Sequence, residues 1–543
     1  MIPRLSETTQ ELLRKFYAPR GWFDRFALRD DRQHILKQIE LSGEVAAIPA
    51  LSHIFVNENR ELQYAAARAM HTLFQGLAPG DFADFDETLR RSSWSSWNYG
   101  RSTFLKAPEN IQSLTIFADY SNFLLGIFAC HADGYTRESA LRALDDCNTG
   151  EELPFLLLRA NDWVENVRTA AVNLLHKRIR AEYVPHFLRF LPLVLRLRRA
   201  GRLNHPATSE RIQELFALPS ACSQLEEGLV SKDAMIRRFC YGVALRTDDG
   251  NRLLGITRRA LSDSDLQISL NAVKALSLAP ASTDLRELIE QTLRSATPQL
   301  RLSALRLATE KYPEFADAEC RRALLDRNSG VRQQAQFYLL KTGGLNVCDY
   351  YAGMLRTATP RTLPKVIAGI GEVCAKPQIS LLEPHLSSPR SEVRLRAYRA
   401  IAQLDRNHPV DSFLKGLGDD SMRVVRAAAV FLRKRANSVG GERIWGIHAK
   451  LTRARQRMWT LFLVAGLTKW DSCYFLMRGL NDIDVEVSTL ARKYLERWVA
   501  RYNKSFVRPT KEQRERASAL EEENQHLLTS AELLLFKTAL RSD

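Results

Sequence analysis

Basic side chains are concentrated in the C-terminal quarter of this sequence, where they could bind a polyanion. Residues 390–516 contain 27 Lys and Arg against 13 Asp and Glu, a surplus of 14 positive charges in a chain whose net charge is +16. Such groups on one face attract phosphates and release the counterions around them. The alternative is an ordinary solvated helix surface. The candidate polyanion-binding residues of this segment are Arg423, Arg433, Lys434, Arg435, Arg443, Lys450, Arg453, Arg455 and Arg457.

A shorter basic run at 195–203 is a second candidate for the same chemistry. It could equally be the end of a helix, where positive charges suit the helix dipole. The residues in question are Arg196, Arg198, Arg199 and Arg202.

Tryptophans accompany both the basic segment and a Ser-rich stretch nearer the N-terminus. Exposed aromatic side chains are enriched where proteins bind partners, so these rings are candidate partner-binding residues. In the alternative interpretation they pin a loop to the core. The candidates are Trp94, Trp97 and Tyr99 in the Ser-rich stretch and Trp445, Trp459 and Trp470 in the basic segment.

Motifs for catalysis are missing from the sequence. It has no G-x-x-x-x-G-K-[ST], no H-E-x-x-H and no G-x-S-x-G. Its eleven histidines show no metal-ligand spacing. We therefore predict a protein without enzyme activity, cofactor or metal.

A recurring segment supplies the scaffold for these candidates. A polar turn, an apolar residue, a basic residue and a helical run return at about 31-residue intervals, with short gaps of 30–34 residues. A fixed period of this length predicts a solenoid of stacked helix pairs, here about a dozen or more repeats. The repeat markers are Asp162, Arg168, Arg237, Arg301, Asp326, Arg332, Arg394, Asp420 and Arg426.

Each repeat reads as two antiparallel helices, such as 284–295 followed by 300–311. The marker arginine comes early in the second helix. It could form a ladder of ligand-binding residues, but we favour a structural role, as a fastener that binds a turn carboxylate.

The marker segments resemble those of the HEAT-repeat family and its shorter relatives of the phycocyanobilin-lyase type. The Val-Arg pairs at 167–168, 331–332, 393–394 and 425–426 match the family pattern, whereas Val485-Glu486 departs from it. The resemblance covers most of residues 40–500. It implies an all-α solenoid, a superhelix of antiparallel helix pairs that acts as a scaffold or adaptor. A remote alternative is a HEAT-like DNA glycosylase, with Asp471 beside Trp470 as the candidate site.

The period breaks at three places, which predicts the domain organisation. Residues 1–30 form an N-terminal cap and residues 31–504 form the solenoid, with an inserted loop near 78–110. Residues 505–543 contain a linker and an acidic, Leu-rich helix at 520–540 that caps the array or binds a partner.

The eight cysteines are scattered singly, without a C-x-x-C pair, and the first residues contain no secretory h-region. We therefore expect reduced cysteines, most of them buried, and a cytoplasmic protein that is not bound to a membrane, although a nuclear location stays open. The predicted function is that of a non-catalytic scaffold that binds a protein partner. The alternative is an accessory subunit that binds DNA or RNA through residues 390–516.

Overall fold

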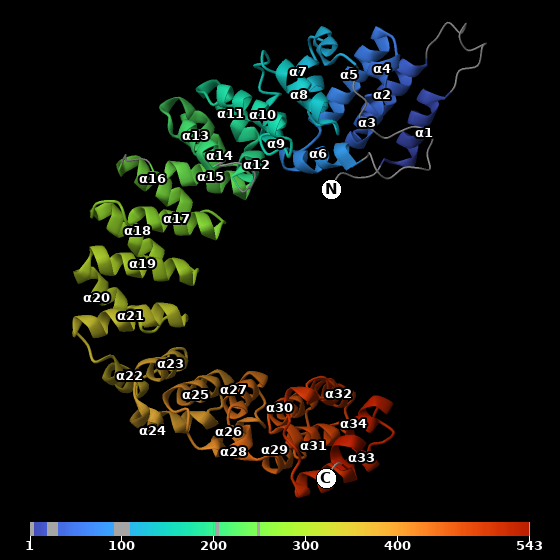
Figure 1. The fold of residues 1–543 in the computed structure, drawn as a ribbon. Helices are drawn as coiled ribbons and strands as arrows, with labels where there is room; N and C mark the ends of the chain where they lie inside the picture. Colours follow the sequence, from blue (N-terminus) through green and yellow to red (C-terminus); the bar gives the residue numbers. More distant parts are fainter. Residues whose placement is uncertain are drawn as a thin grey trace. The chain divides into compact units, whose positions relative to one another are not determined.

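The computed structural model describes residues 5–18, 31–91, 109–198, 200, 206–246 and 250–541. Every regular element in these ranges is a helix, and none is a strand. The prediction of an all-α solenoid is confirmed (Figure 1). Contacts group the chain into two compact units, Met1–Pro280 and Ala281–Asp543, which are described separately.

The first unit contains seventeen of the labelled helices, most of which contact the next helix in the chain. They are α1 Glu7–Tyr17, α2 Arg32–Ser42, α3 Ile48–Leu51, α4 Ile54–Asn57, α5 Arg60–Gln75, α6 Phe82–Arg91, α7 Ser121–Phe128, α8 Gly134–Ala143, α9 Leu153–Arg159, α10 Glu165–Arg178, α11 Val184–Arg189, α12 Leu191–Leu197, α13 Pro206–Ala217, α14 Cys222–Leu229, α15 Ala234–Ala244, α16 Gly250–Leu261 and α17 Leu266–Leu276.

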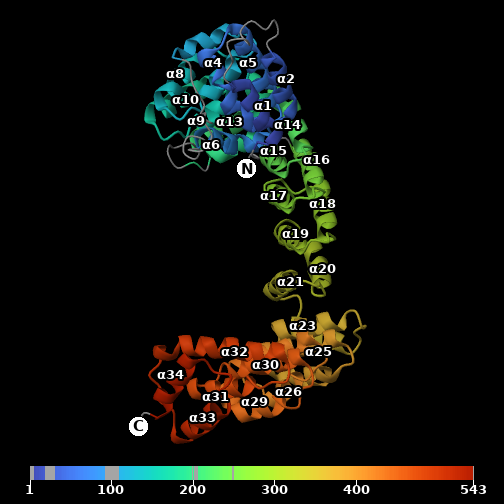
Figure 2. The ribbon, with the colours of Figure 1, turned by 90° about the vertical axis from the view of Figure 1, so that its right-hand side faces the viewer.

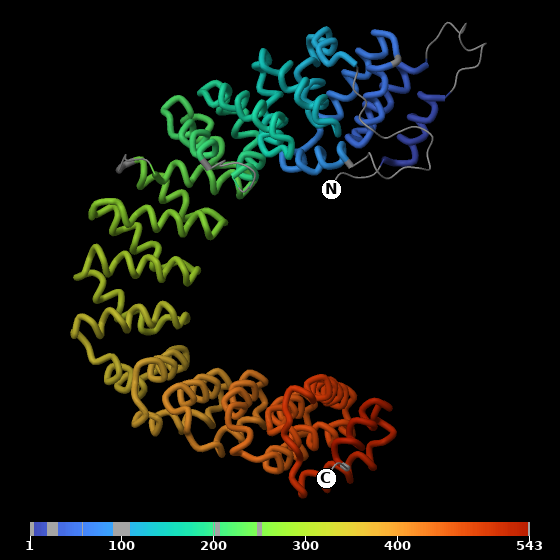
Figure 3. Tube along the Cα trace, in the orientation of Figure 1, coloured from blue at the N-terminus to red at the C-terminus, as the bar shows by residue number. Residues whose placement is uncertain are grey.

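The second unit continues the same arrangement, and Figure 3 traces its path from helix to helix. Its helices are α18 Thr283–Leu293, α19 Pro298–Lys311, α20 Pro313–Ala323, α21 Ser329–Thr342, α22 Val347–Leu355, α23 Leu363–Val373, α24 Ile379–Leu382, α25 Ser391–Leu404, α26 Val410–Gly416, α27 Met422–Arg433, α28 Ala436–Val439, α29 Gly441–His448, α30 Ala454–Val464, α31 Lys469–Gly479, α32 Val485–Ala500, α33 Lys511–Glu523 and α34 Ser530–Arg541.

Two layers of helices make up the second unit. The second helices of successive repeats contact one another in the order α23, α25, α27, α30 and α32, and each also packs on the first helix of its own repeat. Figure 2 shows α25, α30 and α32 in one row, with α26, α29 and α31 in the row below it. This layering places the solvent-facing stripes of the second helices on one side of the unit.

Helical spacing of apolar residues explains why these segments form and stack. In α27, Val424, Val425, Ala428, Ala429 and Leu432 are all buried, and their spacing of three or four residues places them on one side of the helix. The opposite side of α27 carries the charged residues and stays in solvent. The small alanines let α25 and α30 pack closely on either side.

A glycine sets the closest approach between two second helices. A Cβ added to Gly371 in α23 would lie 2.6 Å from the Cα of Ala400 in α25, a distance that real Cβ atoms do not reach. The backbones of α23 and α25 therefore touch at this point.

Two local expectations from the sequence differ from the structure. The range expected as an inserted loop begins with a helix, α6, whose Phe82, Phe85 and Leu89 are buried. The tail contains two helices, α33 and α34, instead of one at 520–540. The break follows Asn524, which is fully buried and bonded to Asn481, and Phe536 of α34 is buried against Trp498. The tail thus packs on the last repeat.

Candidate functional site

Arginines at the start of the second helices tie each repeat to the next. Arg394 donates Nη1 hydrogen bonds to the carbonyls of Ser388 and Pro389 in its own turn, at 2.7 and 3.1 Å. Its Nε and Nη2 bind both carboxylate oxygens of Asp419 in the next repeat, at 2.6 and 2.8 Å. This is a bidentate pair between a rigid guanidinium and a carboxylate.

The same geometry recurs with a constant spacing. Arg301 binds Asp326 and Arg457 binds Asp482, both 25 residues later, while Arg237 binds Asp263 at 26 residues. Each of these three arginines also donates to the carbonyls five and six residues before it, at 2.8–3.2 Å. We call each such pair a rung. The chain is an α-solenoid whose helix-pair repeats are joined by these rungs.

The carboxylates of the rungs also hold their own turns. Asp263, Asp326 and Asp482 each accept a bond from the backbone N–H two residues on, at 2.7–2.9 Å. The Arg237 hydrogen bonds lower the pKa of Asp263. Burial alone would raise the pKa of Asp326 and Asp482, but their arginine partners outweigh it and the net shift is downward. These groups are therefore structural carboxylates.

Two sequence markers need correction. Asp420 was assigned as a rung residue, but its side chain is 85% exposed and pairs with Arg453, while its neighbour Asp419 is the partner of Arg394. Arg426 is exposed, and Leu451 stands 25 residues later, where Arg301, Arg394 and Arg457 each have an aspartate. Arg457, assigned to polyanion binding, is instead a buried rung residue.

The other markers depart from the rung geometry in individual ways. Arg168 bonds the carbonyl of Asp162 in its own turn, at 2.9 Å. Asp162 accepts its rung bond from Arg137, at 3.0 Å. Arg332 reaches 40 residues on, to Glu372 near the end of α23.

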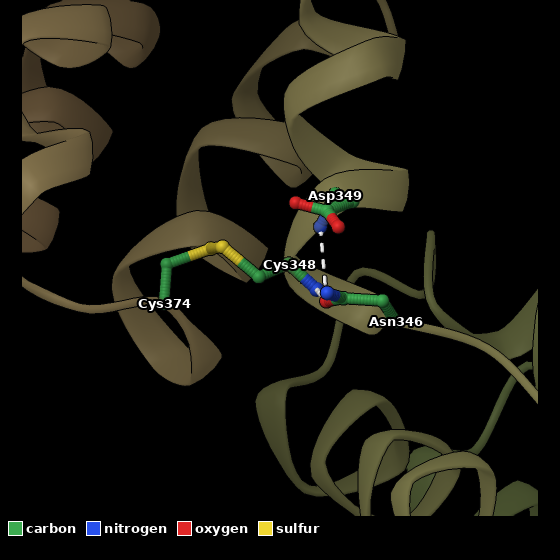
Figure 4. The surroundings of a disulfide bond; sticks show 4 residues. All are labelled: Asn346, Cys348, Asp349 and Cys374. Atoms are coloured by element: carbon green, nitrogen blue, oxygen red, sulfur yellow. Dashed lines mark hydrogen bonds between the residues drawn. A yellow bond between two sulfur atoms is a disulfide. The ribbon is translucent and has the colours of Figure 1, made fainter. Parts of the chain in front are cut away.

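A disulfide crosses the repeat in which the Arg332 rung is irregular. Cys348 at the start of α22 is bonded to Cys374 just after α23, with Cα atoms 5.2 Å apart (Figure 4). Asn346 caps α22 beside it by accepting from the N–H groups of Cys348 and Asp349, at 3.2 and 3.3 Å. This pair departs from the expectation of reduced cysteines, whereas Cys130, Cys240, Cys320 and Cys473 are free and buried as predicted.

Part of the predicted polyanion site is occupied by structural bonds. Arg433 donates to the carbonyls of Leu463 and Ala465 at the end of α30, at 3.1 and 3.3 Å. Arg435 binds the carbonyl of His408. Arg443 pairs with Asp411 and Arg453 with Asp420, on exposed surfaces. Lys434, Lys450 and Arg455 are exposed.

The aromatic residues predicted to bind a partner lie in different environments. Trp470 is 2% exposed, and its Nε1 donates to the carbonyl of Val507 at 2.9 Å. Trp445 is buried and stacks on His448, with centroids 4.2 Å apart. Both are core residues, so their assignment to partner binding is corrected. Trp459 keeps a partly exposed edge against Phe462. Trp94, Trp97 and Tyr99 lie outside the described residues.

The second helices of unit two carry a run of arginines that sequence reasoning mostly assigned elsewhere or missed. The exposed sides of α25, α27, α30 and α32 carry positive charges, together with Glu392 on α25 and Glu486 and Glu496 on α32. We define the basic face as Arg396, Arg399, Arg423, Arg426, Arg455 and Lys493. The i, i+3 spacing of Arg396 with Arg399 and of Arg423 with Arg426 was the available signal.

Arg396 shows how crowded the positive charges of this face are. Burial lowers the pKa of its guanidinium, and neighbouring Arg332, Arg399 and Arg423 lower it further, while Glu392 acts in the opposite direction. Among the described residues, the buried Nε of Arg396 has no acceptor. Around Arg396, therefore, three positive neighbours, Arg332, Arg399 and Arg423, face one carboxylate, Glu392.

The basic run at 195–203 is only partly described. Arg196 and Arg198 are exposed at the end of α12, whereas Arg199 and Arg202 lie outside the described residues. Arg196 lines a small cavity in unit one.

The remaining chemical candidates give no reaction centre. Asp471, the glycosylase candidate, is bonded to Thr468 and Gln513 at 2.5 and 2.9 Å at the start of α31. The described parts of the chain contain no group of three or more His, Cys, Asp or Glu placed to hold a metal. No helix in those parts has the length and apolar character to cross a membrane.

Comparisons with known proteins find likeness in solved structures only. No family model matches the sequence, and no curated protein matches it. Importin beta, crystallised in an ammonium sulfate condition, is 12% identical, with a TM-score of 0.33 over 96% of this chain and 71% of that one. Yeast importin-beta (Kap95p) is 13% identical, with a TM-score of 0.32 over 99% of this chain and 67% of that one.

A third solved structure, of Kap95p with RanGDP, is 11% identical, with a TM-score of 0.32 over 99% of this chain. This chain spans 66% of the length of that protein. At such TM-scores, none of these likenesses bears on function.

Proposed function

We propose that this protein is a non-catalytic HEAT-like scaffold that binds an anionic segment of a protein partner on the basic face. The observation that carries the proposal is the cluster of Arg396, Arg399 and Arg423 on neighbouring helices, where burial and then the neighbouring positive charges lower the pKa of Arg396. An acidic chain laid across α25 and α27 would relieve this repulsion. The location proposed for this interaction is the cytoplasm, on the evidence of the sequence alone.

Stacked second helices suit such a partner because they offer a long surface. Neighbouring helices pack about 8–10 Å apart, so α25, α27, α30 and α32 present charges over roughly 30 Å. Repeat scaffolds bind extended chains across surfaces of this kind. An exposed arginine contributes little alone, but a row of them steers an anionic partner and speeds its association.

A second candidate is single-stranded nucleic acid, which is favoured by Trp459. Its ring is partly exposed on α30, in the same stripe as Arg455. Bases stack on aromatic rings while arginines contact phosphates. Glutamate-rich peptide and nucleic acid are therefore tested side by side.

The experiment compares two triple charge reversals in the full chain. One variant carries Arg423→Glu, Arg426→Glu and Arg455→Glu, and these three side chains are exposed. The control variant carries Lys415→Glu, Arg443→Glu and Lys450→Glu, all exposed and placed on or beside the first helices α26 and α29. Both change the net charge equally, so general attraction is matched.

Fluorescence anisotropy then measures binding of a labelled poly-glutamate peptide, single-stranded DNA and single-stranded RNA at about 0.15 M salt. We expect the peptide to bind the wild type and the control, and to lose about tenfold or more in affinity on the basic-face variant. Binding of nucleic acid alone, lost in the same variant, would favour the second candidate. Equal losses in both variants, or no binding of any probe, would remove the basic face as a site.

A further inference from the structure

Apolar side chains accompany the arginines of the basic face where α27 and α30 lie side by side. Val430 on α27 is 53% exposed, and Trp459 and Phe462 on α30 are partly exposed. The rings of Trp459 and Phe462 meet edge to face, with centroids 5.4 Å apart. We call these three residues the apolar patch. Exposed apolar residues are common singly, but a group of them rimmed by polar residues is typical of a binding surface.

Contacts at both ends show that α27 and α30 run in the same direction. Just before the two helices begin, Arg453 binds a carboxylate oxygen and the carbonyl of Asp420, at 3.0 and 3.1 Å, across 33 residues. At the other end, Arg433 donates to the carbonyl of Phe462 across 29 residues and to that of Leu463 at 3.1 Å. A position on α27 therefore lies level with the position 29 to 33 residues later, on α30.

This register places the exposed residues of the two helices beside one another. Val430 lies level with the turn of α30 that begins at Trp459, and Arg426 lies level with the turn that begins at Arg455. On both helices the arginine precedes the apolar residue by four positions, a rise of about 6 Å. Two arginines thus lie about one helical turn from two apolar side chains on the same surface.

Arg433 forms a fixed wall of the apolar patch. Its guanidinium lies over the ring of Phe462, 4.7 Å from the centroid, and Gly466 leaves the space that the guanidinium occupies. Burial lowers the pKa of Arg433, while Tyr494 on α32 acts in the opposite direction. Because carbonyls at the end of α30 hold this guanidinium, it is a packing group of the patch and not a site for an anion.

The arginines on the other side of the patch are available to an anion. They are exposed, and among the described residues they make no hydrogen bond or ion pair; they are Arg423, Arg426 and Arg455. The carboxylates of the adjoining turns include Asp420, which pairs with Arg453, and Glu486 in the first turn of α32. The surface therefore offers three unpaired arginines directly beside an apolar patch.

We propose that the anionic segment of the partner carries a large apolar residue, which binds against Val430, Trp459 and Phe462 while its carboxylates bind the arginines. This inference rests on the proposed function and adds the side chain that the scaffold selects. In an extended chain, the carboxylate two residues away from the apolar side chain lies on the same side, about 6–7 Å from it. That distance matches the rise between Arg426 and Val430.

An apolar residue would supply affinity that the exposed charges do not. Exposed ion pairs contribute little each and are screened by salt, although they steer association. Burial of an aromatic side chain against two rings and a valine is worth about tenfold or more in affinity. Acidic residues would thus direct the partner to the basic face, and the apolar residue would hold it there.

The test uses the full chain and two labelled peptides of equal length and charge. Both consist of glutamates around one central residue, which is phenylalanine in the first peptide and alanine in the second. Fluorescence anisotropy at about 0.15 M salt measures their affinities, with single-stranded DNA as a further probe. Val430→Ser and Trp459→Ala remove parts of the patch. The matched control is Phe337→Ala, which removes a 64% exposed ring from α21, outside the basic face.

We expect the wild type to bind the phenylalanine peptide about tenfold more tightly than the alanine peptide. Val430→Ser and Trp459→Ala should remove this preference and leave the affinity for the alanine peptide nearly unchanged. Phe337→Ala should behave like the wild type. If Trp459→Ala does not fold, Val430→Ser still decides, because that side chain is largely exposed.

Equal binding of the two peptides by the wild type would overturn this inference and leave the proposed function standing, since glutamates alone would account for the affinity. A preference that survives in both patch variants would also overturn it, because the phenylalanine would then bind elsewhere. Binding of DNA and of neither peptide, weakened by Trp459→Ala, would assign that ring to base stacking. No binding of any probe would reject the proposed function together with this inference.

Discussion

The Arg137–Asp162 network of unit one and the Arg394–Asp419 rung of unit two form at the same position of their repeats, but they differ in how many arginines contact the aspartate. In unit two, one arginine and one aspartate satisfy each other and fasten two repeats. In unit one, α6 and α9 bring Arg90 and Arg159 to the same aspartate. The same arginine–aspartate pair thus becomes a charged cluster when neighbouring helices contribute further arginines. Of these two sites, only the cluster has buried guanidinium Nε atoms without an acceptor among the described residues.

The largest expected effect comes from neutralising the two aspartates in turn. Asp162→Asn leaves three arginines around a neutral amide, so it should destabilise its surroundings by about 3–5 kcal/mol. Asp419→Asn removes one partly exposed pair and should cost about 1–3 kcal/mol. Hydrogen exchange of α8–α10 and of α25–α27 in the intact chain measures each effect locally. Equal loss of protection at the two sites would contradict the distinction.

Removing the disulfide shows how far it stabilises the repeat in which the regular rungs are interrupted. Cys348 and Cys374 close a loop across α22 and α23, with a sequence separation of 26 residues. Converting both to Ser should lower the stability of this repeat by about 3 kcal/mol through the entropy of the unfolded chain. Denaturant unfolding of the oxidised wild type and of the variant measures the difference.

Reduction of the wild type should give the same loss as the double substitution, and the reductant should not affect the Ser variant. A wild type that is equally stable with and without reductant would show that the disulfide does not stabilise α22 and α23.

The pH dependence of stability should differ between the aspartates of the regular rungs and Asp86 of the Arg137–Asp162 network, where Asp86 pairs with Arg159. The folded-state pKa values of Asp263, Asp326 and Asp482 are lowered, so their contribution is present above the ordinary carboxyl range and is lost as the pH falls through the lowered values. The pKa of Asp86 is raised, so its ionisation disfavours the folded state, and acid relieves that cost. Stability should therefore fall below about pH 4.

Unfolding free energy measured against pH for wild type and Asp326→Asn checks this prediction. The variant should show a shallower decline at low pH, because one titrating rung is missing. For Asp86→Asn the decline should instead be steeper. Identical profiles for all three proteins would contradict the assignment.

The smallest expected effect concerns the marker without a partner. Arg426→Ala removes an exposed side chain and should change stability by no more than about 0.5 kcal/mol. Arg394→Ala leaves Asp419 unpaired and should cost about 2 kcal/mol. Thermal unfolding of the two variants compares them directly. A comparable loss in both would mean that Arg426 fastens the solenoid after all.

The architecture could be predicted from the sequence because the repeat period and the spacing of apolar residues are visible within short stretches of the chain. The helix pair predicted at 284–295 and 300–311 is observed as α18 and α19. The fastening role favoured for the marker arginines agrees with the geometry at Arg237, Arg301 and Arg394. The rung acid at 419 was missed by one residue, because Asp419 and Asp420 are adjacent and only the fold decides which one faces the arginine.

Site prediction was poorer because charge counts do not reveal contacts. Arg433, Arg435 and Arg457 belong to the most basic segment, yet their hydrogen bonds go to carbonyls or to a rung carboxylate. Arg396 and Arg399 were overlooked although α25 lies within the basic segment at 390–516. The arrival of Arg90 at Asp162 had no signal in the spacing, since Arg90 comes 72 residues earlier in the chain.

The sequence by itself determined the helical repeat, the order of the helices and the place of the fastening arginines Arg237, Arg301 and Arg394, because these follow from apolar spacing and turn residues within about 31 positions. The tertiary structure alone decided which tryptophans are buried, which cysteines meet and which arginines converge on Asp162. Those outcomes depend on helices from distant parts of the sequence packing side by side, and that packing sets the burial and charge balance that give a side chain its role.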